Sequence, residues 1–322
     1  MAFVRNRHGV THSLLTLFTT CKPFVGEFSR IQRNAITSWS RLRPSCDILI
    51  FGNEPGVGDC CREVGARQVA EVPRSDFGTP LLNGLFSSAE QATKSELLGC
   101  VNADIMLTSD LWSAIETVRR SFSRFLLIAR RWNVTVDCDW DFDARDWETR
   151  LQAYARTQGD LEPIYGGMDV FVYPRGMWQD LPPFAIGRGR WDSALIYQAR
   201  IRDIPVIDAT DRIVSVHQNH GYGHHPQHSK GVFKGPESVR NFQLLGGEEY
   251  IFSALNATHV LTSAGLRRRI VLFPPHFLRK LATLPALYPS LGLLTPVVRL
   301  MAPVWRGIRT MRDPQRRRHG GT

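Results

Sequence analysis

Strand and helix signals alternate along this chain for about 220 residues, and this alternation restricts the fold more than any other feature. Residues 13–20, 46–51 and 97–107 are apolar runs of strand length. Residues 28–42 and 81–95 lie between these runs and carry apolar side chains at helical spacing. Strands that alternate with helices are typical of a sheet joined by crossover helices. The sequence therefore predicts an α/β fold with a mixed sheet at its centre.

The same alternation continues into the second half of the chain. Further strands are expected at 68–72, 125–129, 169–173, 206–208 and 213–216, and further helices at 60–64, 111–122, 147–157 and 193–202. The six cysteines have neither metal-site nor disulfide spacing, and the start of the chain lacks the apolar core of a signal peptide. We therefore expect a cytoplasmic protein with reduced thiols.

The formal charge of +10 is concentrated at one end of the chain. From Leu266 onward there are twelve Lys or Arg and one acid, Asp313, whereas the preceding residues hold 28 basic and 29 acidic side chains. A neutral body argues against nucleic-acid binding, and a basic tail suits an anionic membrane surface. Leu281–Val298 is uncharged, but three prolines interrupt it, so it is expected to lie at a membrane surface rather than to span the membrane. The alternative is a Pro-rich helical hairpin packed on the body.

One polar step, Asn102-Ala103-Asp104, interrupts the apolar run at 97–107. A carboxylate at the end of a buried strand is costly unless something compensates its charge. A divalent cation does so, since Mg²⁺ and Mn²⁺ bind one or two carboxylates together with the oxygens of a diphosphate. The alternative is that Asp104 is solvated or caps the helix that follows.

The order of these parts resembles that of the GT-A type nucleotide-sugar-dependent glycosyltransferases, most nearly bacterial glycosyltransferase-like proteins. The resemblance covers about two thirds of the chain, from Ser13 to His220. In chain order, the parts that carry it are the strand–helix opening, Gly52-Asn53-Glu54, Asn102-Ala103-Asp104, Gly167–Arg175, Trp191-Asp192 and His217. It implies a Rossmann-like mixed sheet with crossover helices in residues 13–228, preceded by an arm at 1–12. A connecting segment at 229–265 and a helical basic tail at 266–322 complete the expected organisation.

The resemblance also implies a divalent metal, Mn²⁺ or Mg²⁺, bound in a weakened Asp-x-Asp site. Asp104 is the expected direct ligand, Asn102 would contact the ribose or a metal-bound water, and His217 takes the position of a second protein ligand. Imidazole favours Mn²⁺. The other histidines of this region are expected to be solvated: His220, His224, His225 and His228.

Asp192 is the expected catalytic base, because by resemblance it opens the helix on the acceptor side. The chain has Trp191 where that family often has Glu, and Asp192 could instead only cap the helix at 193–202. Ligands of open α/β sheets bind beyond the carboxyl ends of the strands. Residues expected to contact the donor substrate on this ground, together with Asn102 and Trp191, are Thr19, Thr20, Asn53, Glu54, Gly78 and Thr79.

The sequence thus predicts a hexosyl- or related transferase that moves a sugar from a nucleoside-diphosphate sugar to an acceptor hydroxyl. A glycan or lipid-linked acceptor, cell-surface polysaccharide or glycolipid synthesis, and the inner face of a membrane are the expected context. Two alternatives remain. One is a non-catalytic scaffold or sugar-binding protein of the same fold, and the other is a nucleotidyltransferase.

Overall fold

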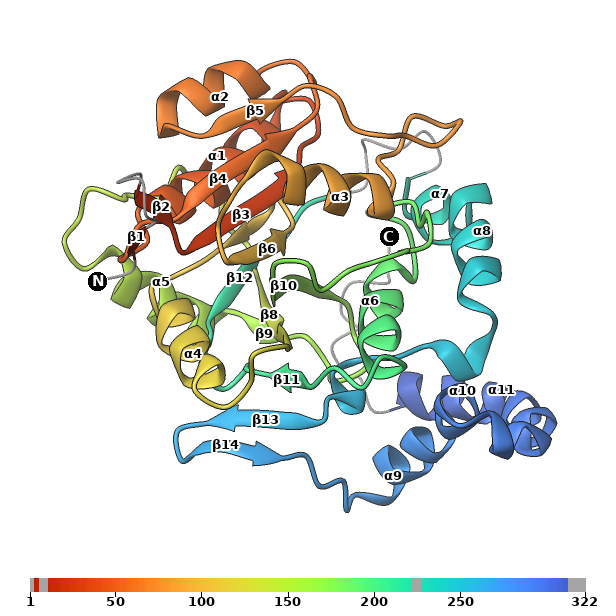
Figure 1. Ribbon diagram of the computed structural model, residues 1–322. Helices are drawn as coiled ribbons and strands as arrows, with labels where there is room; N and C mark the ends of the chain where they lie inside the picture. The colour runs from red at the N-terminus through yellow and green to blue at the C-terminus, as the bar shows by residue number, and fades with distance from the viewer. Residues whose placement is uncertain (1–2, 6–10, 222–227, 312–322) are drawn as a thin grey trace.

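A twisted mixed sheet of twelve strands runs through the centre of the computed structural model, which describes residues 3–5, 11–221 and 228–311 (Figure 1). The strand order is β14-β13-β11-β8-β10-β6-β3-β4-β5; in addition β12 and β9 pair with β8, and β7 pairs with β12. The strands of this sheet are β3 (Leu15–Thr20), β4 (Asp47–Phe51), β5 (Arg67–Val69), β6 (Leu97–Val101), β7 (Ile105–Met106), β8 (Leu126–Val134), β9 (Asp160–Leu161), β10 (Met168–Pro174), β11 (Val206–Asp208), β12 (Ser215–Gln218), β13 (His259–Thr262) and β14 (Gly265–Arg268). Within the predicted arm, β1 (Phe3–Arg5) pairs with β2 (Thr11–Ser13).

Side chains alternate between the two faces of the sheet along each strand, and both faces are apolar. Helices therefore cover both faces. In β4, Ile48 and Ile50 belong to the core shared with α1, whereas Leu49 and Phe51 belong to the core shared with α3 and α6. The helices are α1 (Glu27–Ser40), α2 (Val57–Val64), α3 (Leu82–Ala92), α4 (Asp110–Arg119), α5 (Trp147–Gln158), α6 (Trp191–Arg200), α7 (His228–Lys234), α8 (Pro236–Leu245), α9 (Pro274–Leu281), α10 (Leu284–Leu287) and α11 (Thr295–Met311), with 3₁₀ turns η1 (Glu248–Tyr250), η2 (Ala254–Asn256) and η3 (Pro289–Leu294). The predicted α/β class with a mixed sheet is confirmed.

Strand β10 makes the sheet mixed. It is antiparallel to both of its neighbours, β6 and β8, whereas β3 is parallel to β4 and to β6. The strand predicted at 125–129 is longer in the structure, because β8 continues to Val134 and there pairs with β12 and β9. This continuation past the main sheet carries the β7–β12 pair on which the candidate site is built.

The C-terminal third adds to the sheet as well as to its surface. The β13–β14 hairpin, which the sequence analysis did not predict, places β13 beside β11 and spans residues 265 and 266, where the tail was expected to begin. Arg269 forms an ion pair with buried Asp208, and Thr283 is fully buried. Residues up to α10 therefore pack on the body. In the described part of the chain, no helix has both the length and the apolarity needed to cross a membrane.

Candidate metal and substrate site

The Asn102–Asp104 step forms a tight turn between two strands. Strand β6 ends at Val101, the Ile105 amide donates to the Asn102 carbonyl over 3.1 Å, and β7 begins at Ile105. The indole of Trp39 in α1 donates to the Ile105 carbonyl over 2.8 Å, which holds the far side of the turn. The carboxylate of Asp104 thus lies at the carboxyl edge of a central strand, where α/β sheets bind ligands.

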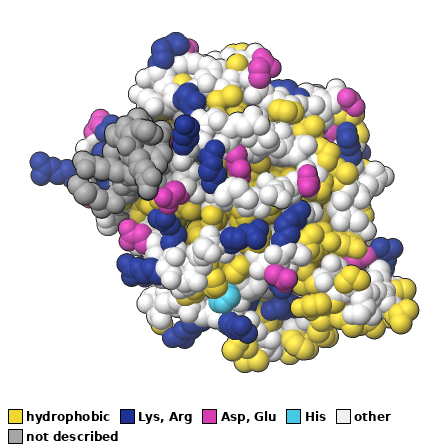
Figure 2. All heavy atoms as spheres, in the orientation of Figure 1, with side chains coloured by type: hydrophobic (Ala, Val, Ile, Leu, Met, Phe, Trp, Pro, Cys, Tyr) yellow, Lys and Arg dark blue, Asp and Glu magenta, His cyan; other side chains and the backbone are white. Residues whose placement is uncertain are grey.

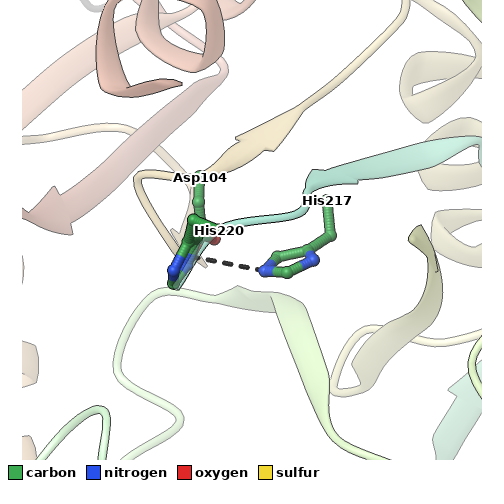
Figure 3. A group of neighbouring side chains, drawn as sticks. All are labelled: Asp104, His217 and His220. Carbon is green, nitrogen blue, oxygen red and sulfur yellow. Dashed lines mark hydrogen bonds and ion pairs between the residues drawn. The ribbon is translucent and has the colours of Figure 1, made fainter. Parts of the chain in front are cut away.

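Strand register brings His217 to this carboxylate. Because β7 and β12 are antiparallel and pair Ile105 with His217, the imidazole lies next to Asp104. His217 Nε2 is 3.7 Å from Asp104 Oδ2, and His220 Nε2 is 3.2 Å from the same oxygen. Ligand atoms of the three side chains all lie within 4.8 Å of one another. Figure 3 shows the side chains of Asp104, His217 and His220 converging.

The chemistry of this cluster fits a divalent cation. Asp104 Oδ1 is buried and has no hydrogen-bond partner among the described residues. Burial raises the pKa of Asp104, but the adjacent imidazoles of His217 and His220 outweigh burial and hold that pKa below its ordinary value. Burial, together with the Arg131 charge, lowers the pKa of His217 to about 3, so its imidazole is neutral and keeps a lone pair. One carboxylate and two imidazoles suit Mn²⁺ better than Mg²⁺.

His220 was predicted to be solvated, and the structure corrects this. Its ring lies edge-on to Phe28, and its side chain is largely buried beside Asp104. His224 and His225 lie outside the described residues, and His228 begins α7. His220 follows His217 by three residues, but the sequence gives no sign that the chain turns back there.

A buried amide network holds the end of β12 in place. Gln218 donates from Nε2 to the Ile31 carbonyl over 2.8 Å, and its Oε1 accepts from Asn34 Nδ2 at 3.0 Å. The Gln218 backbone amide donates to the Asp104 carbonyl over 3.1 Å. Because Gln218 directly follows His217, these bonds fix the position of the imidazole relative to Asp104.

The side-chain amide of Asn102 bonds to Asp169 and not to the two histidines. Its Nδ2 donates to Asp169 Oδ1, and Asp169 Oδ2 pairs with Arg131 Nη1 at 2.6 Å. Burial raises the pKa of Asp169 to about 6; Arg131 opposes this rise, and Asp104 adds to it. The amide of Asn102 thus solvates a second carboxylate close to Asp104.

Asp192 lies in the first turn of α6, next to the start of β10. Its Oδ2 accepts from the Met168 amide at 3.3 Å, and burial raises its pKa. The N-cap is Arg190, with φ 83°, so Asp192 is the second helical residue and not the cap. Trp191 is 5% exposed and packs on Phe171, so its ring contributes to the core rather than to an open surface.

The residues expected at the donor side lie in three places. Thr19 is buried at the end of β3, Thr20 follows it, and Asn53 is exposed after β4. Glu54 pairs with Arg74 at 2.6 Å. Gly78, with φ 80°, has no heavy atom within 4 Å of an added Cβ, so its backbone borders open space.

Thr79 belongs to a polar cluster that joins three segments. Its Oγ1 donates to Glu237 Oε2 over 2.8 Å and accepts from Arg188 Nη2 at 3.0 Å. Arg188 also pairs with Glu237 at 2.8 Å. The hydroxyl of Thr79 is therefore committed to this cluster, and Arg188 is the charged group that it positions.

Lys22 acts on Asp104 and Arg188 acts on Lys22, and neither cation was predicted as a site residue. Burial lowers the pKa of Lys22 to about 8; the Asp104 charge raises it and the Arg188 charge lowers it further. The side chain of Gln32 fixes the Lys22 backbone by bonds of 2.7 and 2.9 Å. Lys22 could have been predicted, because it follows the carboxyl end of the first long strand and ligands of α/β sheets bind at such strand ends.

A cleft of about 520 Å³ lies beside Cys138, whose carbonyl accepts a hydrogen bond from Asn34 Nδ2. Trp140 and Tyr154 line it, with ring centroids 5.7 Å apart, together with Arg150 and Cys138. Trp147 instead packs inside a small core cluster with Val134 and Leu151.

No protein-family model and no curated protein sequence matches this chain. Solved structures do resemble it, and they include a mannosyltransferase, a glucosyl-3-phosphoglycerate synthase and TarS. A mannosyltransferase from Pyrobaculum calidifontis, solved with GDP-Man and Mn²⁺, is 14% identical with a TM-score of 0.41 over 66% of this chain. Glucosyl-3-phosphoglycerate synthase from Mycobacterium tuberculosis, with Mg²⁺ and uridine diphosphate, is 14% identical with a TM-score of 0.38 over 64% of this chain and 72% of its own. TarS from S. aureus, with UDP-GlcNAc, is 9% identical with a TM-score of 0.41 over 64% of this chain. The match spans 59% of the mannosyltransferase chain and 58% of the TarS chain.

Proposed function

We propose that this chain is a metal-dependent glycosyltransferase that moves a sugar from a nucleoside-diphosphate sugar to an acceptor hydroxyl. The observation that carries the proposal is the cluster of Asp104, His217 and His220 at the carboxyl edge of the central sheet. Asp104 Oδ1 is buried without a hydrogen-bond partner in the part of the chain that the structure describes, and it lies next to a neutral imidazole; a bound cation would satisfy both groups.

In this proposal Asp104, His217 and His220 hold the cation, which when bound supplies positive charge to the leaving diphosphate. Lys22 and Arg188 add fixed positive charge on the same side, since the electrostatic effects of Asp104 and Arg188 both reach the Lys22 amine. Departure of the nucleoside diphosphate leaves negative charge on its oxygens, and cations already in place stabilise that charge.

Asp192 is the proposed base. In an inverting transfer the acceptor oxygen forms a bond to the anomeric carbon while the bond from that carbon to the diphosphate oxygen breaks, and the acceptor proton passes to the Asp192 carboxylate. Burial raises the pKa of Asp192, which makes its carboxylate a better proton acceptor once ionised. The Met168 amide orients Oδ2.

A glycan or lipid-linked acceptor, in cell-surface polysaccharide or glycolipid synthesis at the inner face of a membrane, is the proposed context. Trp140 and Tyr154 line a cleft near the site and offer aromatic faces to a sugar ring. The six cysteines are free thiols, which agrees with a cytoplasmic location.

The test is calorimetry with Mn²⁺, followed by UDP, GDP and a panel of nucleotide sugars. We expect Mn²⁺-dependent binding of one diphosphate, and slow hydrolysis of its sugar conjugate. Asp104→Asn should weaken Mn²⁺ binding by about 100-fold, because it removes the only charged ligand of the cluster. The matched control is Asp143→Asn, which removes an exposed carboxylate paired with Arg41 and should leave binding unchanged.

Two outcomes would count against the enzyme. If no diphosphate binds with Mn²⁺ or Mg²⁺, the donor site is absent and the proposal fails. If a donor binds but is neither transferred nor hydrolysed, and Asp192→Asn changes nothing, the chain is the non-catalytic sugar-binding alternative.

A further inference from the structure

Exposed apolar side chains gather on the C-terminal elements. Of the nineteen large hydrophobic residues that are exposed in the described chain, thirteen lie between Ile270 and Val304. Figure 2 shows hydrophobic side chains over the lower right of the molecule, where Figure 1 places α9, α10 and α11. Scattered exposed apolar residues are ordinary, but a concentration of this size marks an interaction surface.

Helix α11 presents an apolar stripe to the outside. Its exposed hydrophobic residues are Val297 (59%), Leu300 (79%), Met301 (37%) and Val304 (49%). Their spacing of three, one and three residues places them on one side of the helix. Arg299 lies about 200° around the helix from Val297 and forms an ion pair with buried Glu249 at 2.7 Å. The helix is thus attached to the body by one side and leaves the apolar side uncovered.

Helix α9 is arranged in the same way. Phe277, Leu278 and Leu281 are exposed. Arg279, on the other side of this helix, donates to the carbonyls of Glu248 and Ile251 over 3.4 and 3.2 Å. Both helices therefore attach through an arginine to the segment around η1, and both direct apolar residues away from it.

The charge of this region has one sign. From Tyr250 to Arg312 the sequence contains nine Lys or Arg and no Asp or Glu. Three of these, Arg269, Arg279 and Arg299, are bonded to the body, so the others supply the positive charge available to a partner. A surface that combines apolar stripes with positive charge is complementary to a lipid bilayer that contains anionic headgroups. A second copy of the chain fits less well, because pairing two such surfaces would bring like charges together.

We propose that α9, η3 and α11 form a membrane-binding surface, in which the apolar stripes enter the headgroup region of an anionic bilayer. The Lys and Arg of this region that are not bonded to the body contact its phosphates. The helices lie along the bilayer surface, as amphipathic interfacial helices do. This surface acts whether or not the chain transfers sugars, so its test is independent of donor binding.

The experiment is co-sedimentation of the full chain with vesicles. We expect binding to phosphatidylcholine vesicles that contain about 30% phosphatidylglycerol to exceed binding to phosphatidylcholine alone by at least about tenfold at low salt. Adding salt should reduce this difference. The triple variant Val297→Gln, Leu300→Gln and Val304→Gln should lose at least about tenfold in binding, since glutamine keeps the helix but removes the apolar stripe.

The matched control is Val239→Gln with Leu244→Gln, which removes two exposed apolar side chains from α8. This variant should bind vesicles like the parent. Circular dichroism and the thermal transition check that both variants are folded. Equal vesicle binding by parent and triple variant would overturn the proposal. The proposal would also fail if the parent did not bind vesicles and sedimentation velocity showed dimers of the parent but not of the triple variant.

Discussion

We predicted from the sequence that Asn102 stands where an Asp-x-Asp pattern has its first carboxylate, and the surroundings of Asn102 account for an amide at this position. The amide donates to Asp169, whose other oxygen pairs with Arg131. A carboxylate at position 102 would instead face Asp169 at hydrogen-bonding distance, and two ionised carboxylates repel. An amide at position 102 therefore fits its surroundings better than a carboxylate would.

We expect Asn102→Asp to lower the free energy of unfolding by about 1–3 kcal/mol at pH 7, although it restores the familiar motif. Burial already raises the pKa of Asp169 to about 6, and the added carboxylate should raise it further. A carboxyl group whose folded-state pKa exceeds its unfolded value costs stability as pH rises through that interval. The loss relative to the parent should thus be small near pH 4 and still be growing at pH 6, because the added carboxylate moves the pKa of Asp169 above that value.

Urea unfolding across this pH range provides the measurement. The control is Asn53→Asp, which changes an exposed asparagine in the same way and should alter stability little. A variant at position 102 that is as stable as the parent at pH 7 would contradict the role given to the amide.

At the scale of elements, β12 places His217 beside Asp104, and the side chain of Gln218 fixes β12 to α1. Gln218→Ala would leave the Ile31 carbonyl and Asn34 without their buried partner. We expect a loss of about 2–4 kcal/mol in unfolding free energy and about tenfold in Mn²⁺ affinity, because His217 loses its support.

Denaturant unfolding and calorimetry test both effects. Asn219→Ala is the neighbouring control, because Asn219 is exposed and its side chain makes one bond of 3.3 Å to Thr135. If the two variants behave alike, the network does not position the imidazole.

Some strands and helices follow from local sequence pattern, and others do not. The first long strand and α1 follow from apolar runs and helical spacing, and their predicted ranges agree with the structure within two residues. The β13–β14 hairpin was missed because its exposed strand, β14, carries arginines instead of alternating apolar residues. The extension of β8 was missed because Arg130 and Arg131 interrupt the apolar run, and both find partners only in the folded chain.

At the scale of the whole molecule, the tail predicted to begin at Leu266 contains two parts with different roles. Its first part belongs to the body: β14 pairs with β13, Arg269 pairs with buried Asp208, and Asn256 donates to buried Thr283 over 2.8 Å. Its second part, from η3 onward, carries the exposed stripe of α11.

We therefore expect two truncations to differ. A chain that ends at Leu266 should lose about 5 kcal/mol or more in unfolding free energy, because it exposes a strand edge and leaves Asp208 buried without its arginine. A chain that ends at Leu287 keeps the sheet intact but leaves buried Glu249 without Arg299, so it should lose stability, though less than the shorter chain. It keeps α9 and lacks the apolar stripe of α11, so its vesicle binding should fall. Calorimetric melting of both chains makes the comparison, and equal melting temperatures would show that residues 267–287 do not stabilise the body.

The sequence by itself determined the α/β class, the place of Asp104 at the end of a central strand and the basic, apolar character of the tail, because these depend on local periodicity and composition. Only the tertiary structure decided that His220 joins Asp104 and His217, that the amide of Asn102 donates to Asp169, and that the charges of Asp104 and Arg188 both act on Lys22. Those contacts join residues more than sixty positions apart. Strand register and chain reversal set such contacts, and neither is encoded in the spacing of neighbouring residues.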